Sequence, residues 1–523
     1  MSDSMTRANV YGIPEAGDLA HYPLVQDKTP LLTYALARRT KILPLEKQGD
    51  TLFVAVSNPL DLEGLEEVRC HTGYALKELY APSEAIEKAI ESCFDQKEDT
   101  TANLLANLTK GGGASLSEIK EESDGYDLLA QEADSPVVKL LNALLLEAIQ
   151  QGASDIHVEP AEDGLKVRYR IDGVLQMRHA PLKEYQSQII TRLKVMAKLD
   201  IAEQRLPQDG RIKLNIGGRQ IDFRISSIPT AYGERLVLRI LDKGNVLVGL
   251  SALGIRPEIL EGLRMLVRLS EGIVLVTGPT GSGKTTTLYS ALSDINSAEI
   301  NIMTIEDPVE YKLQGMAQMG VNPKIKLDFA TGLRHLLRQD PDVIMIGEIR
   351  DRETAEIAIQ AALTGHLVLS TLHTNDAPSA ITRLVDMGIE PYLLSSSVVG
   401  VLAQRLVRKL CPQCKEGYLP TASELLQLGL EENKDGQLTL YRARGCEACF
   451  HAGYKGRHGI YELMPLTHRL KRQLLKSADS LELQRVALEE GLSSLRSEGA
   501  WLVQSGITST AEVLRVSRGN DGF

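Results

Sequence analysis

The sequence is poor in aromatic residues and in long apolar runs. Aromatics make up 4% of the 523 residues, and no run of about 18 apolar residues occurs, the length that a membrane span requires. The chain does not start with basic residues followed by an apolar stretch, so we expect no secretory signal. The net charge of −11 argues against a nucleic-acid partner, which usually selects a basic surface. We therefore expect a cytoplasmic protein whose contact with any membrane is indirect.

Cysteine is also scarce, and four of the six cysteines form two C-x₂-C pairs. In a reducing compartment such pairs are typical of a tetrahedral Zn²⁺ site held by four thiolates. Protein atoms would fill every ligand position, so this Zn²⁺ would be structural rather than catalytic. Disulfide bonds are the alternative. The expected ligands are Cys411, Cys414, Cys446 and Cys449.

The strongest motif is GPTGSGKT, which matches the phosphate-binding pattern G-x-x-x-x-G-K-[ST] without a mismatch. It stands between the apolar run IVLVT and a helical pattern, as such a loop requires. Glycines let backbone amides turn toward phosphates, Lys284 supplies a cation, and the Thr285 hydroxyl can bind Mg²⁺. A chance glycine-rich turn is the alternative. ATP and Mg²⁺ are expected at Gly278, Pro279, Thr280, Gly281, Ser282, Gly283, Lys284 and Thr285.

Acidic residues follow two further apolar runs. Glu348 ends the run DVIMIGE, where open α/β sheets place ligands, and could hold metal-bound water or polarise the attacking water. Glu306, Asp307 and Glu310 follow the run NIMTI, and such clustered carboxylates usually need a cation or an arginine nearby. Whether Glu348 or Glu306 positions the attacking water stays open. A helix-start acid and a solvated turn are the structural alternatives.

Two histidines, His366 and His373, flank the apolar run LVLSTL. A neutral imidazole could sense the γ-phosphate by hydrogen bonding. A lone histidine is more often a structural residue whose ring nitrogens are satisfied by neighbours. Here the segment should end near the phosphate loop, which strengthens the case for a catalytic role.

Arginines gather before the phosphate loop, at Arg211, Arg224, Arg235 and Arg239. Guanidinium groups stay charged and can bind a phosphate through two hydrogen bonds. They could therefore clamp a nucleotide from another domain or another subunit. Ordinary exposed ion pairs are the alternative.

The chain is too long for one hydrophobic core, and its patterns divide it into six segments. Alternating strands predict a half-buried sheet before the phosphate loop, and strands alternating with helices predict a parallel sheet around it. The segments are a small α/β domain (1–97), a flexible linker (98–131), an arginine-rich domain (132–248), an α/β ATP-binding domain (249–410), a tetracysteine segment (411–454) and a helical tail (455–523).

The phosphate loop, TIEDPVEY, IMIGEIRD, GHLVLSTLHTN and the two cysteine pairs follow one another in this order. In this the chain resembles the secretion-ATPase superfamily, and within it the type II secretion ATPases, the E proteins of the general secretory pathway. The phrases ASDIHVEP, RLPQDGRI and GERLVLRILDK are similar to those of the same family. The resemblance extends from about Leu24 to Arg518 and is most specific over 132–465.

The resemblance implies an α/β multidomain fold, with a RecA-like P-loop ATPase domain preceded by a PAS-like domain. It implies a translocase-class ATPase that powers pseudopilus assembly, so that folded proteins cross the outer membrane. The family works as a homo-hexamer on the cytoplasmic face of the inner membrane. Residues 1–97 would dock on a membrane-anchored L-type protein, and an F-type inner-membrane platform protein would receive the motion.

The resemblance also assigns residues. The Asp box of the family falls on Glu306 to Glu310, its Walker B acid on Glu348, and its His box on His366 to His373. The nucleotide-contacting arginines fall on Arg224, Arg239, Arg334, Arg338 and Arg350.

Other functions remain as alternatives. A type IV pilus extension ATPase shares nearly all the motifs, whereas retraction motors resemble this chain without its cysteine pairs. A nucleic-acid translocase is disfavoured by the acidic charge and the few aromatic residues. A scaffold that does not hydrolyse ATP is disfavoured by the intact Lys284 and Glu348.

Overall fold

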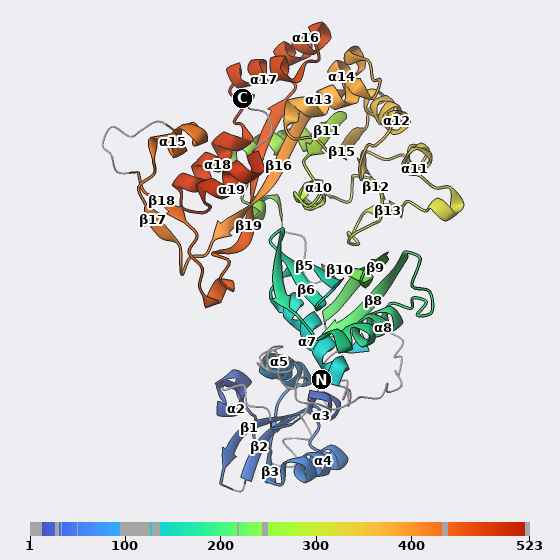
Figure 1. Cartoon of the computed structure of the whole chain (residues 1–523). Coiled ribbons are helices and arrows are strands. Elements are labelled where there is room, and N and C mark those ends of the chain that lie inside the picture. The colour runs from blue at the N-terminus through green and yellow to red at the C-terminus, as the bar shows by residue number, and fades with distance from the viewer. Residues whose placement is uncertain are drawn as a thin grey trace. The chain divides into compact units, whose positions relative to one another are not determined.

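A computed structural model of the chain (Figure 1) falls into two compact units, Met1–Asn245 and Val246–Phe523. The expected linker at 98–131 lies outside the described residues, apart from Tyr126–Asp127. Among the described helices, none combines the length and apolar character that a membrane span requires. The structure describes residues 13–26, 31–32, 34–49, 51–94, 126–127, 136–216, 219–242, 249–430 and 438–517.

The first unit begins with a small α/β domain. Its three-stranded sheet has the order β1-β2-β3, with β1 antiparallel and β3 parallel to β2. Apolar residues of the strands and helices bury one another in a single core. The elements are α2 (Pro23–Gln26), α3 (Tyr34–Thr40), β1 (Ile42–Gln48), β2 (Thr51–Val56), α4 (Leu62–Thr72), β3 (Ala75–Tyr80) and α5 (Ser83–Phe94).

A second, seven-stranded sheet follows in the same unit, in the order β4-β8-β9-β10-β5-β6-β7. Its strands alternate apolar and polar residues, so one face packs against α7 and α8 and the other carries charged side chains. The elements are β4 (Tyr126–Asp127), α7 (Pro136–Gln150), β5 (Ala153–Ala161), β6 (Gly164–Ile171), β7 (Val174–His179), α8 (Gln186–Met196), β8 (Gln208–Ile216), β9 (Arg219–Thr230) and β10 (Gly233–Asp242).

The second unit is built on a seven-stranded sheet of the order β13-β12-β14-β15-β11-β16-β19. All neighbouring strands are parallel except the last pair, β16 and β19. The sheet elements and their connecting helices are α9 (Pro257–Val267), β11 (Gly272–Thr277), α10 (Lys284–Ile295), β12 (Ile302–Glu306), β13 (Ala317–Gly320), α11 (Phe329–Leu336), β14 (Val343–Ile346), α12 (Arg352–Leu363), β15 (Leu367–Leu372), α13 (Ala377–Asp386), α14 (Pro391–Ser397), β16 (Val398–Leu410) and β19 (Tyr454–Pro465).

Helices cover both faces of this sheet, as the near-continuous apolar runs of its strands require. Ile273 and Leu275 of β11 lie in one core with α11, α12 and α13. The alternate residues Val274 and Val276 lie in the other core with α9 and α10. The multidomain α/β class with a parallel ATPase-type sheet is thereby confirmed.

The prediction of a helical tail over 455–523 is wrong for the first residues of this range. Tyr454–Pro465 forms β19, which pairs antiparallel with β16 and so completes the ATPase sheet. Its apolar residues Ile460 and Met464 fill one core while Tyr461 fills the other, a pattern that only a strand of this sheet satisfies. The remaining elements are β17 (Glu416–Tyr418), α15 (Ala422–Leu428), β18 (Leu440–Arg442), α16 (His468–Lys476), α17 (Ser480–Glu489), α18 (Leu495–Gln504) and α19 (Thr510–Ser517). The other segment boundaries stay a prediction.

Candidate functional site

The phosphate loop joins the end of β11 to the start of α10. Gly278, Gly281 and Gly283 have φ angles of +153°, +80° and +90°, a region that residues other than glycine rarely adopt. A Cβ atom at Gly278 would lie 2.4 Å from the backbone oxygen of Gln404. A Cβ at Gly283 would lie 2.8 Å from Nε2 of the same residue. Glycine is therefore required both by the backbone conformation and by the closeness of β16.

Hydrogen-bond donors of the loop are left for a ligand. Helix α10 begins at Lys284, and no side chain caps its first turn. The free amides of such a helix start carry positive partial charge and bind phosphate. The Ser282 hydroxyl is buried without a hydrogen-bond partner among the described residues. A cradle too narrow for a Cβ atom, lined by unused donors, fits a nucleotide phosphate.

The Lys284 ammonium group folds back over this cradle. Its Nζ donates to the backbone oxygens of Gly278 at 2.8 Å and Pro279 at 3.3 Å. Burial lowers the pKa of Lys284 to about 8, and the charge of Arg405 acts in the same direction. The negative charge of Glu348 opposes this shift. A phosphate in the loop would restore the preference for the charged amine.

The parallel strands bring the other expected residues to the same sheet edge. Thr277 of β11 lies opposite Leu372 of β15, and Ile346 of β14 lies opposite Ser370. The segments that follow β11, β14 and β15 therefore start side by side. The Thr277 hydroxyl also lies 2.8 Å from that of Thr374, which ties the loop after β15 to the base of the phosphate loop.

Glu348 follows β14 at this edge, between Arg350 and His373. One carboxylate oxygen accepts a hydrogen bond from Arg350, and the other lies 3.2 Å from His373 Nε2. Burial acts to raise the pKa of Glu348, but the hydrogen bonds and charges of Arg350 and His373 outweigh it, so the pKa lies below its usual value. Glu348 is therefore ionised at neutral pH and, with its side chain 16% exposed, retains access to solvent.

The acidic cluster after β12 has a different environment. Glu306 is buried, and its carboxylate accepts hydrogen bonds from Tyr289, from Thr304 at 2.6 Å and from Gln318 at 3.1 Å. These donors are neutral, and no arginine or lysine is paired with Glu306 among the described residues. Asp307 is exposed, and its charge adds to that of Glu348 in raising the pKa of Arg350.

Glu310 lies in the turn beyond these two acids. It is half-buried, and its backbone amide donates to the Tyr289 hydroxyl at 3.4 Å. That hydroxyl also donates to Glu306, so Tyr289 joins the two acids of the cluster through one oxygen.

The segment with the two histidines ends near the phosphate loop at His373, whereas His366 lies at the opposite end of β15. The catalytic role expected for His366 stays a prediction. His366 precedes β15, its backbone oxygen accepts from Gly272 at the start of β11, and its Nδ1 lies 2.9 Å from the oxygen of Ala361. A strand rises about 3.3 Å per residue, so His366 and His373 are separated by roughly 20 Å. Residues that flank one strand lie at opposite edges of the sheet.

The three arginines expected in the ATPase domain also differ in whether they contact the site. Arg350 contacts Glu348. Arg334 instead donates to Glu353 at 2.5 Å, and Arg338 Nη2 lies 2.7 Å from His335 Nδ1. Of these three arginines, Arg350 is therefore the one that contacts another candidate site residue within the described part of the chain.

The arginines of the first unit form a row across its sheet. Arg224 on β9 lies opposite Arg211 on β8 and Arg239 on β10. Directly opposed residues share a face, and here it is the face away from α7 and α8. Arg239 is 61% exposed and donates to Asp155 at 3.2 Å. The expected contact of Arg224 and Arg239 with nucleotide stays a prediction.

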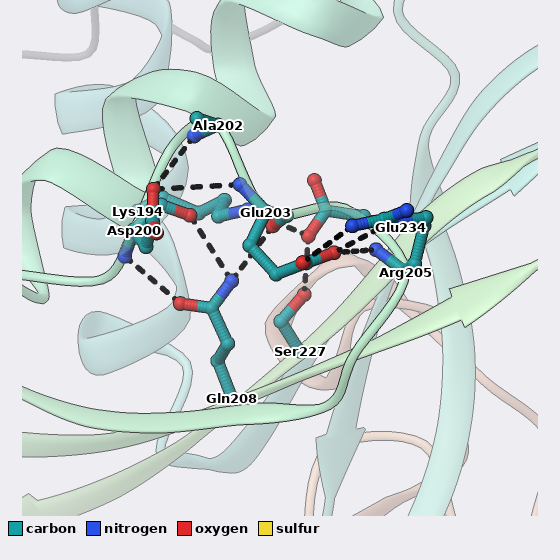
Figure 2. Close-up of polar contacts among 8 residues, drawn as sticks. All are labelled: Lys194, Asp200, Ala202, Glu203, Arg205, Gln208, Ser227 and Glu234. Atoms are coloured by element: carbon teal, nitrogen blue, oxygen red, sulfur yellow. Dashed lines mark hydrogen bonds and ion pairs between the residues drawn. The ribbon is translucent and has the colours of Figure 1, made fainter.

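A buried ion pair holds the loop that leads into this row. Figure 2 shows Lys194 donating to Glu234 at 2.8 Å and to the backbone oxygen of Glu203 at 2.7 Å. Gln208 holds the same loop through Glu203 and Asp200 (Figure 2). Removing one partner of a buried pair leaves an unpaired charge at a cost of about 3–5 kcal/mol. The start of β8, which places Arg211, is therefore firmly anchored.

The four expected cysteines lie together at the end of β16. Their sulfurs are all within 4.8 Å of one another, with separations of 3.8 Å between Cys414 and Cys449 and 3.9 Å between Cys411 and Cys446. A Zn²⁺ ion bonded to four sulfurs at about 2.3 Å separates them by roughly 3.8 Å, whereas a disulfide bond is about 2 Å long. The arrangement fits a tetrathiolate metal site and excludes disulfides.

Two buried polar residues of β16, Gln404 and Arg405, were missed by the sequence analysis. Gln404 Nε2 donates to the backbone oxygen of Ser282 at 2.7 Å. Arg405 Nη2 donates to the backbone oxygen of Asn375 at 2.8 Å. The available signal was a polar pair in the otherwise apolar stretch VVGVLAQRLV, because buried polar side chains require specific partners.

Comparison with known proteins identifies two regions. The family described as Type II/IV secretion system protein matches residues 130–515, and the MshEN domain matches residues 11–100. The Type II secretion system ATPase E of Vibrio cholerae is 45% identical over 488 residues, which are 93% of this chain and 96% of that protein. The Type IV pilus assembly ATPase PilB of Myxococcus xanthus is 44% identical over 507 residues, which are 96% and 89% of the two chains.

Among solved structures, the ATPase DotB of Legionella pneumophila is similar with a TM-score of 0.54 and 20% identity. The similarity covers 76% of this chain and 100% of that chain. At this identity it shows the fold alone.

The lowered pKa of Lys284 predicts a pH-dependent affinity for ATP. The ammonium form prevails below about pH 8 and is lost above it in the free protein, whereas bound phosphates would hold the proton. The Kd for ATP should therefore rise by up to about tenfold per pH unit above pH 8. Equilibrium binding from pH 7 to 10 measures this, with Lys284→Arg as the control whose charge does not titrate. An equal slope in both proteins would contradict the assignment.

The tetracysteine geometry predicts that Cys414→Ser releases metal and lowers the melting temperature, because a metal bound by four thiolates contributes folding energy to the segment that holds it. Elemental analysis and thermal unfolding measure both effects. Cys70→Ser is the matched control, since Cys70 is exposed and lies outside the cluster. Unchanged zinc content and stability in Cys414→Ser would refute the site.

Proposed function

The chain belongs to the Type II/IV secretion system protein family, and from this premise we propose that it hydrolyses ATP to drive pseudopilus assembly in type II protein secretion. One observation carries the proposal. The phosphate loop with Lys284 and the ionised Glu348 with His373 stand at one edge of the same parallel sheet. Ligands bind at this edge in open α/β folds.

In the proposed mechanism, the loop amides and Lys284 bind the triphosphate, and the Thr285 hydroxyl would hold Mg²⁺ together with phosphate oxygens. Bound Mg²⁺ would supply charge neutralisation on the transferred phosphoryl group. Glu348 accepts a hydrogen bond from the attacking water and orients it. Arg350 and His373 keep Glu348 ionised and fix its direction.

Glu348 suits this role better than Glu306. The Glu348 carboxylate is charged, partly exposed and close enough to Lys284 to affect its pKa. The Glu306 carboxylate is buried, with its oxygens engaged by neutral donors of its own surroundings. We assign Glu306 the role of holding the turn with Asp307 and Glu310, in which the charge of Asp307 acts on Arg350.

The assembly follows from the family. We propose a homo-hexamer at the cytoplasmic face of the inner membrane, reached through partners. Residues 1–97 would dock on a membrane-anchored L-type protein, and an F-type platform protein would take up the motion. The match of residues 11–100 to a separate domain family supports a distinct docking module.

Arg224 and Arg239 are proposed to contact nucleotide, and the tetracysteine segment to hold Zn²⁺.

Type IV pilus extension is the second candidate, because the pilus assembly ATPase of Myxococcus xanthus matches at 44% identity. A nucleic-acid partner is not proposed, since the net charge of the chain is −11.

Lys284→Ala should abolish ATP hydrolysis, because the loop loses its only cation toward the phosphates. Glu348→Gln should bind ATP with near-normal affinity but turn it over at least about a hundredfold more slowly, since only the water-orienting charge is removed. Phosphate release and equilibrium binding measure the two effects on the full chain. Near-wild-type turnover in Lys284→Ala would refute the site.

The same Lys284→Ala variant distinguishes the two candidate systems in cells. Loss of export of folded proteins with intact surface pili is the expected result. Loss of pili with intact export would assign the chain to pilus extension instead.

A further inference from the structure

Gln404 stands on β16, the strand beside β11, and is 2% exposed. Both the nitrogen and the oxygen of its side-chain amide make hydrogen bonds. Nε2 donates to the backbone oxygen of Ser282 at 2.7 Å, and Oε1 accepts from the Thr287 hydroxyl at 2.8 Å. Ser282 lies within the phosphate loop and Thr287 in the first turn of α10, so one side chain joins the two segments that would surround the phosphates.

The loop packs tightly against both the backbone and the side chain of Gln404. A Cβ atom at Gly283 would lie 2.8 Å from Gln404 Nε2, and one at Gly278 would lie 2.4 Å from the backbone oxygen of Gln404. At Gly278 the clash would be with the backbone of β16, which cannot shift easily, and at Gly283 it would be with the end of the Gln404 side chain, which would have to move. The side-chain amide of Gln404 therefore lies directly against the loop, in addition to making its two hydrogen bonds.

The strand itself does not require an amide at this position. Backbone pairing with β11 runs from Val398 to Ala403, and the neighbouring Leu402 and Val407 are fully buried in the two apolar cores. An apolar residue would satisfy the sheet equally well. An amide can donate to a carbonyl oxygen and accept from a hydroxyl at once, whereas an apolar side chain can do neither. The choice of glutamine is thus explained by the loop rather than by the sheet.

The next residue makes the corresponding contact with the other side of the site. Arg405 is 7% exposed, and its Nη2 donates to the backbone oxygen of Asn375 at 2.8 Å and to the side-chain oxygen at 3.0 Å. Asn375 lies in the loop after β15, two residues beyond His373. Consecutive residues of β16 therefore hold the phosphate loop and the His373 loop.

We propose that Gln404 is a positioning residue for nucleotide binding. Through Ser282 and Thr287 it fixes the phosphate loop in the shape that receives a triphosphate before the nucleotide arrives. The inference rests on the proposed function, because it assigns Gln404 to the same ATP site.

The test replaces Gln404 by leucine, which keeps the volume and removes both hydrogen bonds. The KM for ATP should rise about tenfold, the loss expected when two hydrogen bonds no longer order the loop. The kcat should change less than about threefold, because Glu348 and His373 are untouched and the lost interaction acts on binding. Steady-state hydrolysis and equilibrium ATP binding by the full chain measure this split.

Two further variants keep the test decisive. Val407→Ala creates a cavity on the same strand, in the core that does not contain α10, so it should lower the melting temperature without raising KM. Thr287→Val removes one of the two hydrogen bonds and should raise KM about threefold, even if Gln404→Leu folds poorly. In the Thr287→Val background, the change at Gln404 should have a smaller effect than in the wild type.

An unchanged KM in Gln404→Leu would overturn the proposal. Equal rises of KM in Gln404→Leu and Val407→Ala would also overturn it, since they would show a general loss of stability. Failure of the proposed function is separate: it would appear as turnover in Lys284→Ala, whatever the variants of Gln404 do.

Discussion

The close packing of the phosphate loop against β16 is the constraint on which the rest of the site depends. A Cβ atom at Gly278 would clash with the backbone of Gln404, and the side-chain amide of Gln404 lies against Gly283 and donates to Ser282. Because the strands are parallel, the same edge collects Glu348 and His373 from β14 and β15. A binding group, an ionised acid and a histidine meet there from three segments that are distant in sequence.

Local patterns were sufficient for the parts of the site that lie in one segment. The phosphate loop, the acid after β14 and the cysteine pairs each have a spacing that the chemistry itself dictates, and the structure places them as a cradle, a charged edge and a sulfur cluster. The alternation of apolar runs with helical patterns likewise predicted a parallel sheet, because both faces of such strands must be covered.

What the sequence could not provide depends on contacts between distant segments. Gln404 meets Ser282 across more than a hundred residues, and β19 joins the ATPase sheet only because β16 offers an open edge. His366 and His373 lie at opposite ends of β15, as the apolar run between them predicted, and the contact of His373 with Glu348 depends on the pairing of β14 with β15. The neutral surroundings of Glu306 were equally invisible, because Tyr289 and Gln318 come from other elements.

The central claim is that the backbone amides of residues 278–285 bind a triphosphate. Hydrogen–deuterium exchange of the full chain, with and without a non-hydrolysable ATP analogue and Mg²⁺, tests it at the residues concerned. The account predicts strong protection of the loop and the first turn of α10, with weaker protection of the segments after β14 and β15. Exchange in the loop that is unaffected by saturating nucleotide would contradict it.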